Sequence, residues 1–161
     1  MSDPLLVPLL VASTVTTGLV AGLFYAFTCA VMPGLRRAED AVFVATMTAI
    51  NAAIQNAVFA VTFVGALIFT GGALVAGLAS GSRTVPWVVA GLALYVATLV
   101  ITGVRNVPLN NQIDAHAADP GVTATEARRA FERPWNRWNT VRTVLTTAAL
   151  ACLAGALLAV S

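Results

Sequence analysis

The sequence predicts an all-α membrane protein, a four-helix bundle of transmembrane helices. Of its 161 residues, 58% are hydrophobic and only 10% are charged, whereas a soluble domain is about a quarter charged. The charged residues are also unevenly placed, because four runs contain no Asp, Glu, Lys or Arg: residues 4–35, 41–82, 84–104 and 143–161. A helix needs about 20 mostly apolar residues to cross a bilayer, so each run is long enough for one span.

The spans are expected near residues 5–31, 55–79, 86–105 and 138–160, within a single domain of residues 1–161. The first is not expected to be a signal peptide, because Asp3 precedes it, no basic segment does, and its apolar run is too long. The segment 38–56 is helical in character and contains no Pro or Gly. We therefore expect it to continue into the second span as one long helix, extended at its cytoplasmic end.

The third loop carries further helix signals. Pro108 and Pro120 are expected to end any long helix, because proline has no N–H to donate. Thr123 and Glu126, three residues apart, form the pattern of a capping box and predict a short helix in this loop. Pro134 is expected to break that short helix and to open the fourth span.

The distribution of arginine predicts how the protein is oriented. All nine basic residues are Arg, and with four spans the first and third loops lie on the same side of the membrane. That side carries eight of them: Arg36, Arg37, Arg105, Arg128, Arg129, Arg133, Arg137 and Arg142. The positive-inside rule then places both loops in the cytoplasm and both termini outside. Basic residues that are all Arg, with abundant Ala, indicate a high-GC genome and hence a bacterial plasma membrane.

Few residues suit a metal or a bound cofactor. Cys29 and Cys152 fall near opposite ends of the first and fourth spans, with no CxxC pattern, so both are expected to be small buried residues. The single His116 lies in the third loop, and no cluster of His, Cys and carboxylate has metal-ligand spacing. There is no glycine-rich phosphate loop. We expect no metal, no cofactor and no nucleic-acid partner.

Polar and aromatic residues gather where all four spans reach the cytoplasmic side. They are Tyr25 and Thr28, then Thr48, Asn51 and Gln55, then Arg105, Asn106, Asn110 and Asn111, and finally Trp135, Trp138, Asn139 and Arg142. In the second and fourth groups, spacings of three, four and seven align the side chains on one helix face. An amide in hydrocarbon needs a hydrogen-bond partner, so we expect a polar pocket in the cytoplasmic half of the bundle.

A simpler interpretation stays open for the tryptophans and arginines, which are common at membrane surfaces. Counted back from Ser161, Arg142 lies about 28 Å along the helix, near the inner boundary of a hydrocarbon core of ~30 Å. Helix spacing nevertheless places Arg137 on the flank of the polar stripe. We therefore expect Arg137 to be a surface anchor, and Arg142 to point inward and meet Asn106 or Asn110.

The stretches "FYAFTCAVMPGL", "RNVPLNNQI" and "RPWNRWNTVRT" resemble the anthrone oxygenase-like family (DUF1772) of small four-span membrane proteins. The resemblance covers almost the whole chain. It is most specific at Asn106-x-Pro108-x-Asn110 and at Trp135-x-x-Trp138-Asn139-x-x-Arg142. It implies oxidation of a polyketide anthrone to an anthraquinone by O₂.

This chemistry implies roles for the polar residues. An anthrone that loses a methylene proton becomes a delocalised anion, which can pass an electron to O₂ without metal or flavin. Hydrogen-bond donors would stabilise the anion, and the candidates are Arg142, Asn106, Asn110, Asn139 and Arg105. Candidates for holding the substrate are Trp135, Trp138, Tyr25, Asn51 and Gln55. Asp114 and His116 are the nearest candidates for the base, and a water held by asparagines is the alternative.

Two function classes therefore remain. The first is a cofactor-independent membrane oxygenase that takes a small apolar aromatic molecule and O₂. The second is a non-catalytic membrane protein that binds a lipid or small hydrophobic ligand, or acts as a partner subunit. A transporter is disfavoured, because no acidic residue lies in a predicted span. The lipid bilayer is a partner in either case, and homo-oligomerisation is left open.

The predicted orientation can be tested by cysteine labelling. Single cysteines introduced at Ser2 and Ser161, with the native cysteines replaced, are expected to react with a membrane-impermeant reagent added outside the cell. Labelling of both positions only from the cytoplasmic side would overturn the orientation.

Overall fold

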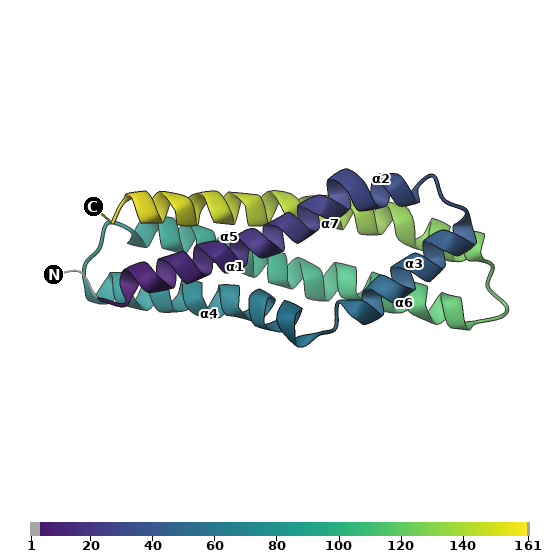
Figure 1. The fold of residues 1–161 in the computed structure, drawn as a ribbon, viewed down its shortest axis with the longest axis horizontal. Coiled ribbons are helices and arrows are strands. Elements are labelled where there is room, and N and C mark those ends of the chain that lie inside the picture. Colours follow the sequence, from purple (N-terminus) through teal and green to yellow (C-terminus); the bar gives the residue numbers. More distant parts are fainter. Residues whose placement is uncertain (1–3, 161) are drawn as a thin grey trace.

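The computed structural model describes residues 4–160, which fold into an elongated bundle of helices (Figure 1). The first half of the chain forms α1 (Leu6–Ala26), a π-helical turn η1 (Phe27–Val31), α2 (Met32–Leu35), α3 (Asp40–Ala53) and α4 (Ala57–Ala79). The second half forms α5 (Val85–Ile101), a second π-helical turn η2 (Thr102–Asn106), α6 (Val107–Ala118) and α7 (Ala124–Leu158). The α2–α3 and α6–α7 turns share one end, here called the loop end.

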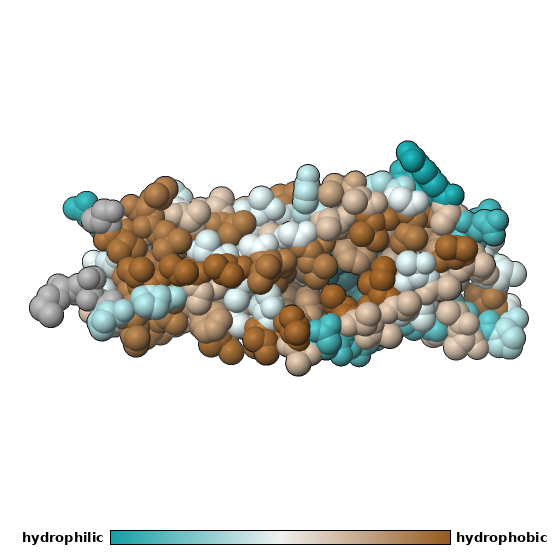
Figure 2. All heavy atoms as spheres, viewed as in Figure 1, coloured by the Kyte–Doolittle hydropathy of each residue, from teal (hydrophilic) through white to brown (hydrophobic). Residues whose placement is uncertain are grey.

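Four helical stretches are long and apolar enough to cross a membrane: Leu6–Leu35, Ala57–Ala79, Val85–Ala118 and Ala124–Leu158. This confirms the predicted fold class and fits an integral membrane protein. Figure 2 shows apolar side chains over most of the face near the α4–α5 turn, and hydrophilic ones gathered toward the loop end. The direction of insertion stays a prediction, and its labelling positions, Ser2 and Ser161, lie outside the described residues.

The expected long second helix is wrong, because the chain leaves the helix between Ala53 and Ala57. Asn56 has an extended backbone (φ −127°, ψ 162°). Its Oδ1 accepts a hydrogen bond of 2.9 Å from the N–H of Phe59, and its Nδ2 donates one of 2.7 Å to the carbonyl oxygen of Ala53. One amide therefore ends α3 and caps the start of α4, without the Pro or Gly that we took as the signal for a break.

Two expected helix ends are also wrong. Pro108 lies in the first turn of α6, which continues α5 through η2, and Pro134 lies inside α7. A proline crowds the carbonyl four residues before it, and a π-helical turn rearranges the carbonyls in that position. Pro33 and Pro108 each follow such a turn at the same spacing, two residues after Val31 and Asn106.

The capping box is confirmed, but the helix that it opens is longer than expected. The Thr123 side chain accepts from the N–H of Glu126, and the Glu126 carboxylate accepts from the N–H of Thr123 at 2.9 Å. The helix then continues through Pro134 as far as Leu158, so the expected short helix is the first part of α7. Phe131 and Trp135, on either side of the proline, are both buried and fasten this part of the helix to the bundle.

Arg128 ties α3 to the first part of α7. Its guanidinium donates to Asp40 at 2.9 Å and to the carbonyl oxygens of Ala38 and Arg36 at 2.9 and 3.0 Å. The Thr125 hydroxyl donates to the other oxygen of Asp40 at 2.6 Å. These bonds close the loop end over a buried apolar group, the loop-end cluster: Met32, Phe43, Val44, Met47, Ile113, Ala127, Phe131 and Trp135.

Both cysteines are free thiols. Cys152 is half-buried, but the expectation of burial is wrong for Cys29, which is exposed. Each residue of an α-helix is rotated by about 100° from the one before it. Cys29 lies in η1, where the wider π-helical turn changes this rotation and so changes the direction in which its side chain points.

The Asp40 contacts predict a pH dependence of stability. The hydrogen bond from Thr125, together with the bond and charge of Arg128, lowers the pKa of Asp40 below its ordinary value. Its stabilising contribution is therefore fully present above the unfolded pKa of about 3.9 and is lost as pH falls through the folded pKa. We expect the wild type to lose more melting temperature than Asp40→Asn between about pH 6 and pH 3. Parallel losses in the two proteins would contradict this assignment.

Candidate functional site

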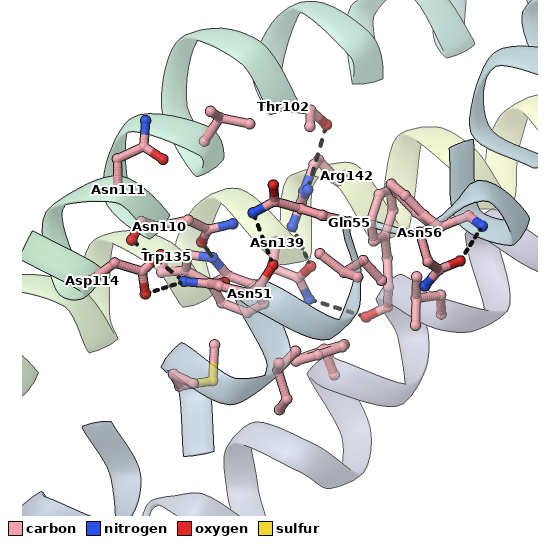
Figure 3. Close-up of a pocket in the computed structure, with 18 of the residues that line it drawn as sticks. Asn51, Gln55, Asn56, Thr102, Asn110, Asn111, Asp114, Trp135, Asn139 and Arg142 are labelled. Carbon is pink, nitrogen blue, oxygen red and sulfur yellow. Dashed lines mark hydrogen bonds between the residues drawn. The ribbon is translucent and has the colours of Figure 1, made fainter. Parts of the chain in front are cut away.

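A pocket of about 490 Å³ opens beside the loop-end cluster, and residues of α1, α3, α4, α6 and α7 line it (Figure 3). The volume lies in the range of small-molecule sites. The lining residues are Leu23, Phe24, Phe27, Met47, Ile50, Asn51, Ile54, Gln55, Asn56, Phe59, Ala60, Thr102, Val107, Asn110, Asn111, Asp114, Trp135, Asn139 and Arg142. Residues from all four spans line the pocket, as predicted, and its place in the cytoplasmic half stays a prediction.

Aromatic rings form one wall of this pocket. The ring of Phe27 packs against that of Trp135 with centroids 5.4 Å apart. The Arg142 guanidinium carbon lies 4.1 Å from the ring centroid of Phe24 and 5.6 Å from that of Trp135. Such rings can stack on a flat apolar ligand and bring its edge toward a cation.

Arg142 is the only pocket-lining cation among the described residues, and it is 5% exposed. Its Nη2 donates to Asn139 Oδ1 at 2.8 Å, its Nη1 lies 3.4 Å from the hydroxyl of Thr102, and its Nε has no partner. No ion pair to it is present within residues 4–160. Since a buried charge is costly without compensation, this arrangement suits a ligand that brings or develops negative charge.

Asn139 holds Arg142 in place through contacts that reach a neighbouring helix. Its Nδ2 donates to the carbonyl oxygen of Phe24 and to the hydroxyl of Thr28, both at 3.0 Å. Thr28 in turn lies 3.0 Å from the hydroxyl of Thr143. With its nitrogen committed to α1 and η1, the Asn139 amide turns its oxygen toward the guanidinium.

The opposite side of the pocket carries a carboxylate. Asn51 donates to Asp114 Oδ1 at 3.1 Å and contacts the carbonyl oxygen of Asn110 at 3.4 Å. Gln55 Nε2 donates to the carbonyl oxygen of Asn51 at 3.2 Å, and Trp135 Nε1 donates to Asn110 Oδ1 at 2.7 Å. Figure 3 shows this chain of amides running along α3 and α6. Asp114 is therefore oriented by one neutral donor, the amide of Asn51.

Three sequence-based placements are wrong. Arg142 meets Thr102 and not Asn106 or Asn110. Tyr25 is 59% exposed and does not line the pocket, because one residue beyond the buried Phe24 points about 100° away. Asn106 is buried, but it also lies off the pocket wall, and its side-chain oxygen and nitrogen have no partner.

Arg105 and Trp138 likewise do not line the pocket. The guanidinium of Arg105 lies 5.1 Å from the ring centroid of Trp138, and that of Arg137 lies 5.7 Å from it. Both arginines are exposed and Trp138 is half-buried. Arg105, Arg137 and Trp138 therefore lie together outside the pocket, whereas the sequence analysis expected only Arg137 to be a surface residue.

Of the two candidates for the base, only Asp114 lines the pocket. His116 is half-buried on α6 and does not line it. In the part of the chain that the structure describes, no group of three His, Cys, Asp or Glu side chains could hold a metal ion.

The lining residues that sequence reasoning missed are mainly apolar, such as Phe24 and Phe27. Thr102 did carry a signal, since it precedes Asn106 and Asn110 by four and eight positions.

Comparison with known proteins gives one match. A family model described as anthrone oxygenase matches residues 56–152. This range includes α4, the α5–η2–α6 helix and most of α7, and therefore Asp114, Trp135, Asn139 and Arg142. No curated protein and no solved structure matches the chain.

The hydrogen bond between Trp135 and Asn110 predicts a difference between two similar substitutions. Trp135→Phe leaves Asn110 Oδ1 without its donor, so the free energy of unfolding is expected to fall by about 1–3 kcal/mol. Trp138→Phe removes the same ring atoms from a half-buried surface position and is expected to cost less. Denaturant unfolding in one detergent compares them, and equal costs would contradict the site geometry.

Proposed function

Because the chain belongs to the anthrone oxygenase family, we propose that it is a membrane-embedded oxygenase acting on an anthrone-like or other apolar polycyclic substrate, without a cofactor. The observation that supports this most is the buried Arg142 guanidinium, which lines the pocket and has no carboxylate partner in residues 4–160. A substrate that becomes an anion during the reaction supplies the missing negative charge.

The first step is removal of a proton from the ring methylene. The Asp114 carboxylate, held by the amide of Asn51, takes this proton as general base. The electron pair left on carbon delocalises through the rings onto the carbonyl oxygen. Arg142, positioned by Asn139, stabilises that oxygen in a site largely removed from water, where an aimed donor is most effective.

The second step consumes O₂. The anion passes one electron to O₂, and the resulting carbon radical and superoxide combine to form a C–O bond. A proton on the outer oxygen completes a hydroperoxide. Loss of the second methylene proton with cleavage of the O–O bond then leaves a carbonyl and releases water, so CH₂ and O₂ become C=O and H₂O. Within this scheme the protein supplies charge stabilisation, proton transfer and a position for the rings.

The aromatic wall supports a flat substrate. Phe24 and Trp135 lie beside Arg142, and Phe27 packs against Trp135, so a stacked polycycle can place its oxygen near the guanidinium. In this scheme Trp135 is locked in place by its bond to Asn110. Asn51 and Asn110 thus serve mainly to position Asp114 and Trp135.

Quinone formation from an anthrone tests this proposal. With protein in nanodiscs, the rate of quinone absorbance under air is expected to exceed that of protein-free nanodiscs and to vanish under argon. Arg142→Met is expected to lower the rate about 10²–10³-fold while the protein stays folded, because it removes an unpaired buried charge. Asp114→Asn is expected to lower it about 10²–10⁴-fold.

Arg137→Met is the matched control, since this arginine lies on the same helix but outside the pocket. It should retain the wild-type rate. Equal rates for wild type, Arg142→Met and Arg137→Met would contradict the proposed site. Saturable binding of the anthrone without turnover would favour the non-catalytic ligand-binding alternative.

A further inference from the structure

Buried apolar groups close the pocket along the bundle axis. On one side lies the loop-end cluster, whose Met47 and Trp135 also line the pocket. On the other side lies a second buried group, formed by Val20, Phe24, Ala66, Tyr95 and Ala149.

One opening of the pocket lies on its flank, between α1 and the turn that joins α3 to α4. Gln55, Asn56 and Ala60 line the pocket and are themselves exposed. Leu23, which faces them from α1, is half-buried. Figure 2 shows this flank hollowed, with hydrophilic atoms visible at the bottom of the hollow. We refer to this opening as the lateral portal.

The break between α3 and α4 creates the portal. The side chains of a continuous helix would cover this position. Here the helix is interrupted, and the Asn56 side chain bonds to the ends of α3 and α4. Phe59 also lines the pocket, and its ring stacks on Phe63 of its own helix with centroids 5.1 Å apart. On the α4 side, the lateral portal is therefore bordered by the small and apolar side chains of Ala60 and Phe59.

The portal lies at the start of a candidate membrane span. Beside Ala60, the outer face of α4 carries Val58, Val61 and Val64, which are 79%, 69% and 50% exposed, and α4 is one of the four candidate spans. A ligand in the pocket thus meets a polar donor at Arg142 and an apolar exit at Ala60. A tailless polycycle would leave that exit open to lipid chains.

We propose that the pocket takes a membrane-resident fused-ring phenol, ketone or quinone that carries an aliphatic chain. The oxygen-bearing rings bind against Trp135 and Arg142, and the chain passes through the lateral portal and lies in the bilayer. This inference rests on the proposed function for the ring-binding site and adds the chain and the route of access. The ligand reaches the site from the membrane and never needs to enter water.

Two probes test the chain: 2-methyl-1,4-naphthoquinone and its analogue with a geranyl chain at position 3. Each is added to nanodiscs at matched bilayer mole fraction, and saturable quenching of Trp135 fluorescence reports binding. A Trp87→Phe, Trp138→Phe background leaves Trp135 as the one tryptophan of the chain. We expect the chain-bearing quinone to bind at least tenfold more tightly.

Two variants test the portal in the same background. Ala60→Phe places a ring in the doorway and is expected to weaken binding of the chain-bearing quinone at least fivefold. Val61→Phe adds the same ring on the adjacent lipid-facing position and should leave it unchanged. Equal binding of both quinones, or equal effects of the two variants, overturns the proposal.

Anthrone turnover separates this result from the proposed function. If wild-type protein oxidises anthrone but does not prefer the chain-bearing quinone, the chain and portal are wrong and the oxygenase stands. If the chain-bearing quinone binds and Ala60→Phe weakens it, but no anthrone is oxidised, the portal stands and the proposed activity is wrong.

Discussion

A buried guanidinium without an acidic partner is the constraint on which the rest of this site depends. Arg142 is surrounded by the amide oxygen of Asn139, the hydroxyl of Thr102 and the rings of Phe24 and Trp135. Neutral dipoles and ring faces lower the cost of burying the charge without cancelling it. The site therefore keeps a capacity for negative charge, which an ion pair would have consumed.

The fold meets this constraint with features that an ideal helix bundle lacks. The π-helical turn η2 brings Thr102 to Arg142, and η1 carries Thr28, which holds Asn139. The broken second helix leaves the pocket open on its flank, while Arg128 fastens α3 over the loop end. Local departures from regular helix thus coincide with the pocket, as is common for π-helical turns at functional sites.

Sequence reasoning identified the four spans and most of the polar pocket, because hydropathy and helix spacing are local signals. Asn139 and Asn51 were found because polar groups in an apolar run need partners, and Asp114 because it is one of the titratable groups nearest to them. It failed at Asn56, whose side chain makes a helix break of the kind that Pro or Gly usually makes. It also failed at Pro134, which tertiary packing holds within α7. The face of Tyr25 was also misjudged, since it is the neighbouring Phe24, about 100° away on α1, that points into the bundle.

The central claim is that Arg142 meets negative charge on the ligand. The most direct test compares the dissociation constants of anthracene-9-carboxylate and its neutral methyl ester, in nanodiscs, for wild type and Arg142→Met. We expect the wild type to bind the carboxylate at least tenfold more tightly than the ester, about 1.4 kcal/mol, and the variant to lose this preference. The same carboxylate-to-ester ratio in both proteins would contradict it.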